Sequence, residues 1–430
     1  MHKPIKTTID LFIDKLDKSG IGISLKQNED VYFIPYALPG ETVKANIINK
    51  FNSKVYCSNV EILKNSSERF ENTCKHFTKC GGCLLQHWEY ENYKKWKFNS
   101  IRNPLLKLTT DVKILDMISA KNFSRRRAKF FLRQYNNSCN LGFKKYKSET
   151  LININNCIII DPEILRFMTE LKNSFNTNYL TNEILVFHVN KLDYGLDILI
   201  QIKKSLKIDY LINIFKNFKS KIASIYLQQN NLNPELILFY NKNKLNFGNC
   251  HVYGLIPPAG FYQATKVAEN ELIKNILNEI EIKNDYILDL YSGSGTFTLP
   301  LLKNGYKVYA IDNNKSSMES LVKSSKEQNL FNNIEYDILN LNKEIIETEF
   351  FHKFDVVILD PPRAGSLLQL TSIVETKVKK VIYVSCNVQS FLRDTQILLS
   401  NGYKIKYVLP IDQFLYTSHL EIFSVFETFN

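Results

Sequence analysis

Several features that mark membrane and secreted proteins are missing from this chain. Its longest apolar runs fall well short of the about 20 residues that a membrane-spanning helix needs, so we expect no span. Residues 1–7 lead straight into a strand-like stretch, without the long apolar core or small-residue cleavage site of a secretory leader. We therefore expect a cytoplasmic protein without a membrane partner, and a disulfide framework is unexpected for its eight cysteines.

Internal repeats and low-complexity linkers are also missing, so the 430 residues have to be divided among ordinary domains. A chain of this length is too long for one hydrophobic core and is expected to form two or three domains. Its composition, 44% hydrophobic and 23% charged, is typical of globular proteins.

Arginine is scarce, which makes its distribution informative. Only nine of the 55 basic residues are arginine, and three of the nine stand together as Arg125, Arg126 and Arg127, followed by Lys129. Residues 91–135 hold twelve basic and three acidic residues, in a chain of net charge +12. Such a block is typical of a surface that binds phosphates, and clustered arginines favour bidentate phosphate contacts or base stacking. The alternative is a solvated charged face on an exposed strand.

Residues 6–63 alternate apolar and polar side chains in short runs separated by turns. This period of two predicts a small β-barrel, a fold that often binds oligonucleotides. Residues 36–41, Tyr-Ala-Leu-Pro-Gly-Glu, resemble a turn of TRAM domains, which are RNA-binding barrels attached to RNA-modifying enzymes. We therefore expect an RNA-binding barrel of TRAM or OB-like type over residues 1–65.

The rest of the chain changes pattern near residue 262. Residues 110–260 alternate strand-like runs with polar loops, which predicts a mixed, largely antiparallel sheet within a central α+β domain at 66–262. Residues 263–430 alternate helices and strands, which predicts a doubly wound parallel sheet. The expected fold class is therefore α/β, with a Rossmann-like domain at residues 263–430.

Three cysteines lie within ten residues of one another. Cys74, Cys80 and Cys83 are joined by a loop that contains two glycines, which let the backbone fold around a common centre. Zinc would complete such a set with His76 or His87, whereas an iron-sulfur cluster takes three local thiolates and one distant cysteine. The spacing favours the cluster but does not identify the distant cysteine. The candidates are Cys57, Cys139, Cys157 and Cys250.

A glycine turn follows the strand-like run at residues 286–290. Its sequence, Ser-Gly-Ser-Gly, lets a ligand approach the backbone, and strand ends are where open α/β sheets bind nucleotides. The next strand-like run ends in Asp312, about twenty residues later, where a carboxylate can accept hydrogen bonds from a ribose. The third glycine of a dinucleotide site is missing, which argues against a pyrophosphate cradle.

Two further strand-like runs end in polar turns. Residues 355–359 run into Asp-Pro-Pro-Arg from Asp360 onward, where the prolines stiffen the loop and remove backbone donors. Residues 381–384 run into Ser-Cys-Asn around Cys386, and a thiol in this position is a candidate nucleophile. The alternative is that Cys386 is inert core packing, which is common for cysteine.

Taken together, these patterns are similar to those of the RNA (uracil-5-)-methyltransferase family, over nearly the full chain. The shared motifs are CxxxxxCGGC at 74–83, GFxQ at 260–263, DLYSGSG at 289–295, DPPRAG at 360–365, SCN at 385–387 and HLE at 419–421. The cysteine set, the TRAM-like start and the Arg-Ala-Gly of the fourth motif lean toward the iron-sulfur branch that acts on bacterial 23S ribosomal RNA.

This resemblance implies a role for each candidate residue. Cys386 would be the nucleophile and Glu421 the base, and Cys157 would complete the ligand set of a 4Fe-4S cluster with Cys74, Cys80 and Cys83. The methyl donor would be S-adenosyl-L-methionine. The residues implied near the donor are Gln263, Tyr291, Thr296, Asp312, Asn340 and Asp360. The implied partner is 23S ribosomal RNA, at the uridine numbered 1939 in bacteria, and we expect a monomer to bind it.

The chemistry explains why a thiol and a carboxylate are needed together. Uracil C5 is a poor nucleophile toward a methyl sulfonium, so addition of the Cys386 thiolate to C6 would turn C5 into an enolate-like carbon that attacks the methyl group. Glu421 would then remove the C5 proton, and elimination of Cys386 would release 5-methyluridine. The target base should be flipped out or lie in a loop.

Other functions fit parts of the same pattern. The same chemistry could act on a different uridine of 23S ribosomal RNA or on transfer RNA. A radical methylthiotransferase also combines TRAM and iron-sulfur parts, but it needs cysteines spaced CxxxCxxC, which this chain lacks. A non-catalytic RNA-binding protein would use Cys386 and Glu421 only as structural residues and would bind RNA without methyl transfer.

Overall fold

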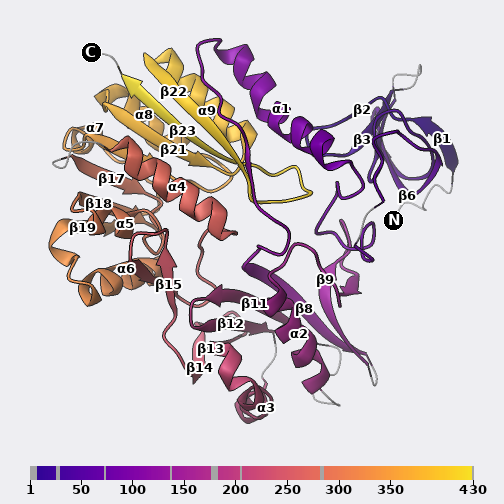
Figure 1. Cartoon of the computed structure of the whole chain (residues 1–430), viewed down its shortest axis with the longest axis horizontal. Helices are drawn as coiled ribbons and strands as arrows, with labels where there is room; N and C mark the ends of the chain where they lie inside the picture. The colour runs from indigo at the N-terminus through magenta and orange to yellow at the C-terminus, as the bar shows by residue number, and fades with distance from the viewer. Residues whose placement is uncertain are drawn as a thin grey trace. The chain divides into compact units, whose positions relative to one another are not determined.

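The computed structural model describes residues 7–25, 30–71, 74–135, 138–175, 183–203, 206–280 and 285–428 (Figure 1). By its internal contacts the chain divides into two compact units. The first comprises Met1–Ile101, Phe143–Ile158 and Phe414–His419, and the second comprises Arg102–Gly142, Ile159–Gln413 and Leu420–Asn430. Among the described residues, none of the helices is long and apolar enough to cross a membrane. The three domain boundaries expected from the sequence stay predictions, because a division by contacts does not test them.

A six-stranded sheet forms the N-terminal part of the first unit. Its strands are β1 (Thr8–Phe12), β2 (Lys15–Leu16), β3 (Gly22–Leu25), β4 (Val31–Ile34), β5 (Thr42–Phe51) and β6 (Lys54–Lys64). They lie in the order β1-β5-β6-β4-β3-β2, and the described pairs are antiparallel except for β4 with β6. Leu11, Ile34, Val43 and Val55 are buried in one apolar core, as an alternating pattern requires. The β-rich start predicted from the sequence is confirmed.

A buried carboxylate explains the turn at residues 36–41. Gly40 has φ +84°, a conformation that glycine adopts without strain, and it lets the chain reverse beside Glu41. Glu41 is fully buried, accepts a hydrogen bond from the Leu38 N–H at 2.8 Å and forms an ion pair with Arg69. The ion pair joins the end of the sheet to the segment that leads into the cysteines.

The first unit also contains the short strand β10 (Leu151–Asn153) and most of helix α1 (Tyr90–Leu108). Tyr93 and Lys97, one helical turn apart, are fully buried. Tyr93 packs with Leu38, Leu85 and Trp88 in a small apolar cluster, so the helix is held to the body of the unit by one face.

A mixed sheet forms part of the second unit. Its strands are β8 (Arg127–Tyr135), β9 (Ser138–Lys144), β11 (Ile184–Leu192), β12 (Gly195–Ile202), β13 (Ile222–Gln229) and β14 (Glu235–Phe239). They lie in the order β9-β8-β11-β12-β13-β14, antiparallel except for β12 with β13. Figure 1 shows the helices α2 (Pro162–Ser174) and α3 (Ile208–Phe215) beside this sheet, and the 3₁₀ turn η1 (Lys216–Lys221) follows α3. The largely antiparallel sheet predicted for this region is confirmed.

An eight-stranded sheet forms the other part of the second unit. Its strands are β7 (Ile118–Ser119), β17 (Tyr286–Leu290), β18 (Lys307–Asp312), β19 (Ile334–Ile338), β20 (Val356–Leu359), β21 (Lys380–Ser385), β22 (Tyr403–Asp412) and β23 (Glu421–Thr428). They lie in the order β19-β18-β17-β20-β21-β23-β22-β7. All pairs are parallel except those of β23 with β21 and β22.

Helices alternate with these strands along the chain. They are α4 (Lys266–Glu279), α5 (Thr298–Lys303), α6 (Lys315–Glu327), α7 (Thr348–Phe351), α8 (Leu367–Thr376) and α9 (Val388–Ser400), with the 3₁₀ turn η2 (Phe331–Asn333) and the hairpin of β15 (Lys244–Phe247) and β16 (Val252–Leu255). Strands and helices share one apolar core that includes Ile287, Val308, Ile358 and Ile382. The doubly wound parallel sheet predicted for this region is confirmed.

Candidate active site

The carboxyl ends of the central strands carry the polar residues predicted to be functional. Tyr291 follows β17, Asp312 ends β18, Asp360 follows β20 and Cys386 follows β21. The strands β17 and β20 are neighbours, although the chain forms β18 and β19 between them. Where strand order reverses in this way, the loops on either side diverge and α/β proteins bind their ligands. The fold therefore gathers four predicted residues at one edge of one sheet.

The turn after β17 has an open side. Tyr291 has φ 65° and Gly293 has φ 55°, and a side chain added at Gly293 would meet no atom within 4 Å. This space lets a ligand approach the main chain. The Asp312 carboxylate accepts hydrogen bonds from the Gly293 N–H at 3.0 Å and from the Asn314 N–H at 2.7 Å. Asp312 therefore fixes the glycine turn relative to the end of β18.

Three other residues predicted near the methyl donor have different surroundings. The Tyr291 hydroxyl shares a hydrogen bond of 3.2 Å with the Ser366 hydroxyl. Thr296 is half-buried just before α5. Asn340 uses its side chain within its own turn, where Oδ1 accepts a hydrogen bond from the Asn342 N–H at 3.2 Å. These contacts do not test donor binding, so the assignments stay predictions.

A chain of polar side chains links Glu421 to Asp360. Gln413 donates hydrogen bonds to Glu421 Oε2 at 2.7 Å and to Gln263 Oε1 at 2.8 Å. Gln263 donates in turn to Asp360 Oδ2 at 3.4 Å. Three predicted residues are thus brought together by Gln413, which is not among those predicted from the sequence. Its position directly after a strand is the same signal that identifies Asp360.

Burial raises the pKa of both carboxyl groups in this chain. Glu421 is 3% exposed, and burial raises its pKa to about 7 although the hydrogen bond from Gln413 acts in the opposite direction. The pKa of Asp360 lies well above its ordinary value, first because of burial and then because of the negative charge of Glu421. A carboxyl group whose pKa is close to neutral can take up and release a proton at physiological pH.

Cys386 lies within electrostatic reach of these carboxyl groups. The pKa of its thiol is raised to about 11, first by burial and then by the negative charges of Glu421 and Asp360, while Arg363 acts in the opposite direction. Asn387 fixes the turn, because its Oδ1 caps α9 at 2.9 Å from a backbone N–H and its Nδ2 donates to the Arg363 carbonyl oxygen at 3.1 Å. The site therefore offers a half-buried thiol beside two carboxyl groups and a guanidinium group.

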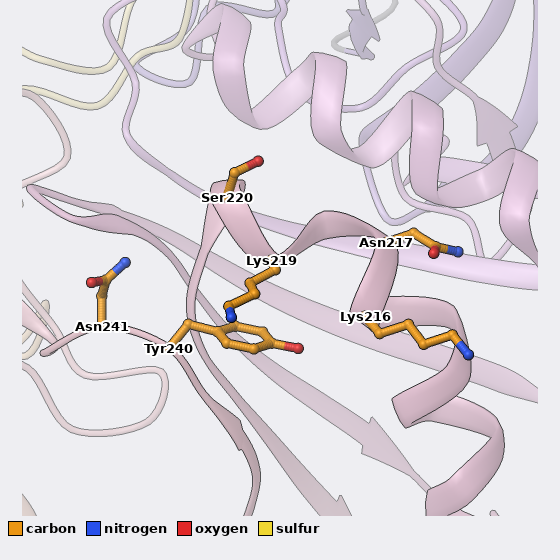
Figure 2. A pocket seen from close by; sticks show the side chains of 6 residues that line it. All are labelled: Lys216, Asn217, Lys219, Ser220, Tyr240 and Asn241. Atoms are coloured by element: carbon orange, nitrogen blue, oxygen red, sulfur yellow. The ribbon is translucent and has the colours of Figure 1, made fainter.

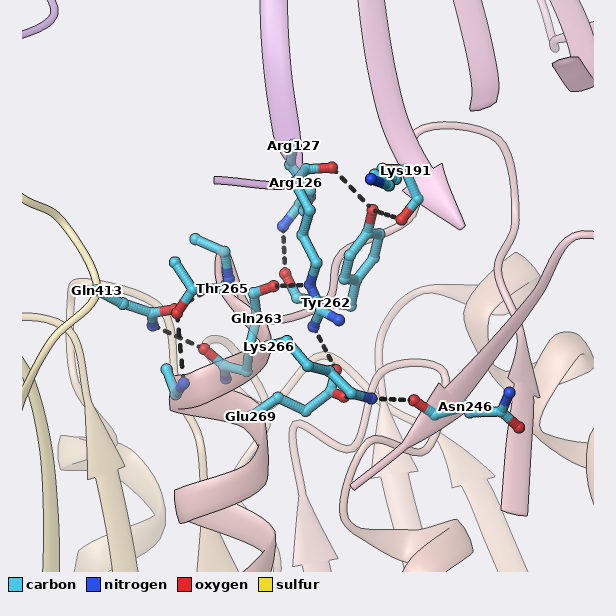
Figure 3. Close-up of polar contacts among 12 residues, drawn as sticks. Arg126, Arg127, Lys191, Asn246, Tyr262, Gln263, Thr265, Lys266, Glu269 and Gln413 are labelled. Carbon is cyan, nitrogen blue, oxygen red and sulfur yellow. Dashed lines mark hydrogen bonds and ion pairs between the residues drawn. The ribbon is translucent and has the colours of Figure 1, made fainter. Parts of the chain in front are cut away.

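Arg126 holds the segment that carries Gln263 (Figure 3). Its Nε donates to the Gln263 carbonyl oxygen at 3.1 Å, and its guanidinium group forms an ion pair with the fully buried Glu269. The Tyr262 hydroxyl donates to the Arg126 carbonyl oxygen at 3.2 Å. Arg126 is only 6% exposed. Arg126 thus has a buried partner within the fold, and its RNA contact stays a prediction.

The neighbouring basic residues differ in their exposure. Arg127 is half-buried, donates to the Tyr262 carbonyl oxygen at 2.7 Å and lies 4.6 Å from the ring centroid of Phe261, which is 63% exposed. Arg125 is half-buried and donates to the Arg127 carbonyl oxygen at 3.1 Å, whereas Lys129 is exposed on β8. RNA contacts of Arg125, Arg127 and Lys129 stay predictions.

The four predicted cluster cysteines all belong to the first unit. The loop that carries three of them is joined to the segment that carries Cys157. The Gly81 N–H donates to the Lys144 carbonyl oxygen at 3.0 Å, and a hydrogen bond of 2.9 Å joins His76 Nε2 to Asn155 Oδ1. A side chain added at Gly81 would come within 2.9 Å of a neighbouring backbone nitrogen, so only glycine fits this close approach.

The thiols act on one another electrostatically. Burial raises the pKa of Cys80, a hydrogen bond from the Gly82 N–H lowers it, and Cys157 and Cys74 raise it. Burial raises the pKa of Cys83 to about 12, and the same two thiols contribute to that increase. All eight cysteines are free of disulfides. The role of the four thiols as ligands of an iron-sulfur cluster stays a prediction.

Within the described ranges, no group of three or more His, Cys, Asp or Glu side chains is arranged to hold a metal ion, and the four predicted cluster cysteines lie in these ranges. The iron-sulfur cluster and the alternative zinc site therefore both stay predictions. His87 is 1% exposed, and neither of its ring nitrogens has a hydrogen-bond partner among the residues that the structure describes. Its pKa is lowered to about 3, first by burial and then by the positive charge of Arg69.

A surface pocket of about 510 Å³ lies between η1 and the end of β14 (Figure 2). It is lined by Lys216, Asn217, Lys219, Ser220, Tyr240 and Asn241. The ammonium group of Lys219 lies 5.7 Å from the ring centroid of Tyr240. The pocket contains none of the residues predicted to be functional, and its lysines provide a reference surface for tests of RNA binding.

Known proteins resemble this chain over nearly its whole length. The family described as tRNA (uracil-5-)-methyltransferase matches residues 89–428. An RNA methyltransferase of Caulobacter vibrioides is 31% identical, over 97% of this chain and 99% of its own. A 23S rRNA (uracil(1939)-C(5))-methyltransferase of Shewanella sediminis is 27% identical, over 99% of this chain and 97% of its own. A solved structure shares the fold with a TM-score of 0.75. It is the crystal structure of the Pyrococcus abyssi tRNA (uracil-54, C5)-methyltransferase in complex with S-adenosyl-L-homocysteine. The two chains are 22% identical, over 97% of this chain and 99% of that chain.

Proposed function

The chain belongs to the tRNA (uracil-5-)-methyltransferase family, and from this premise we propose that it methylates C5 of the uridine numbered 1939 in 23S ribosomal RNA. Membership makes the chain an RNA (uracil-5-)-methyltransferase. Relatives named for this uridine, from Shewanella sediminis and Shewanella piezotolerans, each align with 99% of the chain and support the target. The observation that carries the reaction is the gathering of Cys386, Glu421 and Asp360 at one sheet edge.

In the proposed reaction Cys386 forms a bond from sulfur to uracil C6. The electron pair of the C5–C6 double bond moves toward the O4 carbonyl, and C5 becomes nucleophilic and takes the methyl group. The thiol has to lose its proton first, and Arg363 is the charged group that lowers its pKa and so favours the thiolate. The half-buried position of Cys386 excludes part of the solvent that would otherwise compete for C6.

Glu421 completes the reaction as the base. It removes the proton from C5, the electrons of that bond re-form the C5–C6 double bond, and the Cys386 sulfur leaves as a thiolate. Its pKa of about 7 suits this role, because the ionised form is populated at neutral pH and the group can also release the proton afterwards. Gln413 supports Glu421 by donating a hydrogen bond to the carboxylate.

S-adenosyl-L-methionine would supply the methyl group from a positively charged sulfur, which would keep the electron pair of the broken carbon–sulfur bond and leave as the thioether S-adenosyl-L-homocysteine. We assign the binding of S-adenosyl-L-methionine to the residues Gln263, Tyr291, Thr296, Asp312, Asn340 and Asp360. Support comes from the open side of the Gly293 turn and from the position of Asp312 at the end of the next strand. Asp360 offers negative charge to the sulfonium, and a bound cation would in turn lower the pKa of that carboxyl group.

We assign a 4Fe-4S cluster to Cys74, Cys80, Cys83 and Cys157. The mutual electrostatic effects of these thiols and the glycine loop support the assignment. We also assign RNA contacts to Arg125, Arg126, Arg127 and Lys129 and to the N-terminal sheet. Lys129 is supported by its exposure, whereas Arg126 would have to leave its buried ion pair with Glu269 to reach RNA.

A covalent trapping experiment tests the reaction and its target together. The protein is incubated with S-adenosyl-L-methionine and RNA that carries 5-fluorouridine. A base cannot remove the fluorine at C5 as it removes a proton, so the reaction stops at the covalent intermediate. A protein–RNA adduct should accumulate for the wild type and for Cys250→Ala, a half-buried cysteine outside the site, but not for Cys386→Ala.

The position of the adduct identifies the substrate. Adducts on a 23S fragment that contains uridine 1939, with none on transfer RNA, support the proposed target. Adducts on transfer RNA or on another uridine would contradict the proposed target but would still support the proposed mechanism. Normal RNA binding without any adduct would show that the chain is a non-catalytic RNA-binding protein.

A further inference from the structure

Six residues, Phe414–His419, form a loop that belongs to the first unit although its neighbours in sequence belong to the second. We call this segment the crossing loop. It begins directly after Gln413 and ends two residues before Glu421, and these two side chains are joined by a hydrogen bond of 2.7 Å. The crossing loop is therefore the covalent connection between the proposed base and the glutamine that supports it.

Helix α1 holds the crossing loop through two buried polar side chains. Lys97 Nζ donates to the Phe414 carbonyl oxygen at 3.0 Å and to the Tyr93 hydroxyl at 3.0 Å. The Tyr93 hydroxyl accepts a hydrogen bond from the Tyr416 N–H at 2.9 Å, and the two tyrosine rings lie 5.7 Å apart. Both Lys97 and Tyr93 are fully buried.

The segment that follows Cys83 holds the loop from another direction. The N–H groups of Leu84 and Leu85 both donate to the Tyr416 carbonyl oxygen, at 2.9 and 3.1 Å. Tyr416 itself has φ 57°, a backbone conformation that a tyrosine adopts only when its surroundings impose it. Its N–H and its carbonyl oxygen are thus both held in place by residues of the first unit.

A packing role alone does not account for Lys97. Removing an ammonium group from water is costly unless hydrogen bonds replace the lost hydration. Apolar contacts already attach α1 to its unit through Tyr93, Leu85 and Trp88. The buried amine instead points its hydrogen bonds at the backbone of the crossing loop and at the tyrosine that holds the same loop.

We infer that Lys97 and Tyr93 are positioning residues that hold the crossing loop and thereby set Glu421 for removal of the C5 proton. Because Leu84 and Leu85 directly follow Cys83, the ligand loop of the assigned cluster is part of the same anchor. Loss of the cluster would then slow proton removal through the crossing loop. This inference rests on the proposed function, and it concerns only the step after methyl transfer.

The variants Lys97→Met and Tyr93→Phe test this inference in the full-length, cluster-containing protein. Lys97→Met keeps the length of the side chain without its donors, and Tyr93→Phe removes only one hydroxyl group. The matched control is Lys94→Met, on the same helix, where the lysine pairs with Glu91 at the surface. If Lys97→Met does not fold, the same measurements can be made on Tyr93→Phe.

The first readout is the covalent intermediate on RNA with ordinary uridine. In both variants we expect kcat to fall about tenfold or more with little change in KM, because loss of a well-oriented proton acceptor costs about 10²-fold or more when complete. A Cys386 adduct should accumulate on ordinary RNA, while the yield of the 5-fluorouridine adduct stays at the wild-type value. Turnover within twofold of Lys94→Met, without such an adduct, would overturn the inference.

The second readout does not depend on activity. Hydrogen exchange of the amides in the crossing loop should be faster in Lys97→Met than in Lys94→Met, and faster again after a chelator removes iron from the wild type. Unchanged exchange in both cases overturns the anchor. A wild type that forms no 5-fluorouridine adduct overturns the proposed function instead, and the exchange measurement still decides whether the anchor exists.

Discussion

The two sites of this protein are built in opposite ways. The proposed catalytic residues stand at the ends of strands of one hydrogen-bonded sheet. The proposed cluster cysteines stand outside the helices and strands, on segments that are connected by single backbone hydrogen bonds such as that from Gly81 to Lys144. A site on a sheet edge keeps its geometry when one side chain is removed. A site built from loops depends on the group that its side chains bind. Mutations should therefore disturb the structure locally in the second unit and over a longer range in the first.

The largest expected effect is that of Glu421→Gln on turnover. Without a base the C5 proton stays in place, so we expect kcat to fall about 10²–10⁴-fold. A covalent adduct through Cys386 should accumulate on ordinary RNA and be visible as a shifted band in a denaturing gel. Thermal unfolding should change little, because glutamine can still hydrogen-bond to Gln413. A loss of the fold would show that Glu421 is mainly structural.

Removal of a proposed cluster ligand should affect the first unit before the second. Cys83→Ala leaves three thiols that cannot complete the cluster, so we expect loss of bound iron and sulfide and of the visible absorption of the purified protein. Limited proteolysis should cut the first unit at much lower protease concentration than in the wild type, while the second unit resists as before. Equal sensitivity of both units would contradict the contrast between the two sites.

Buried carboxyl groups of the second unit should make the stability of the protein depend on pH. Burial raises the pKa of the fully buried Asp289 to about 7 from its ordinary 3.8. Between these values the folded protein keeps a proton that the unfolded chain has released, so this group lowers stability as pH rises through the window. In the wild type this group lowers the free energy of unfolding by up to about 1.4 kcal/mol per pH unit, and Asp289→Asn should abolish that decrease.

Urea unfolding of both proteins at pH 5, 6, 7 and 8 measures this difference. The free energy of unfolding of Asp289→Asn, relative to the wild type, should increase up to about pH 7 and then level off. A difference that stays constant with pH would mean that Asp289 ionises normally in the folded protein.

The smallest expected effect is that of a surface charge on RNA binding. Lys129→Glu should weaken RNA binding a few-fold and lower the dependence of affinity on salt by about one phosphate contact. The matched control is Lys216→Glu, in the pocket between η1 and β14, which makes the same change in net charge. Filter binding at several salt concentrations compares the two. An equal loss of RNA affinity in both variants would show that Lys129 acts only through the net charge of the protein.

Sequence patterns identify the parts of this protein that follow from local rules. Alternation along strands and the glycine turn after β17 are local, so the parallel sheet and its functional edge can be predicted. The burial of Arg126 could not be predicted, because its partner Glu269 is 143 positions away and strand alternation does not reveal a buried ion pair. Gln413 and the crossing loop are missed for the same reason, since their importance comes from contacts made by distant segments.

The discontinuity of the first unit has a consequence for biosynthesis. Almost all of the second unit precedes Phe414 in the chain, so a ribosome has made most of the protein before it supplies the last segment of the first unit. Until then the hydrogen-bond donors of Leu84 and Leu85 lack their native acceptor, the Tyr416 carbonyl oxygen. Completion of the cysteine site is thereby tied to completion of the polypeptide.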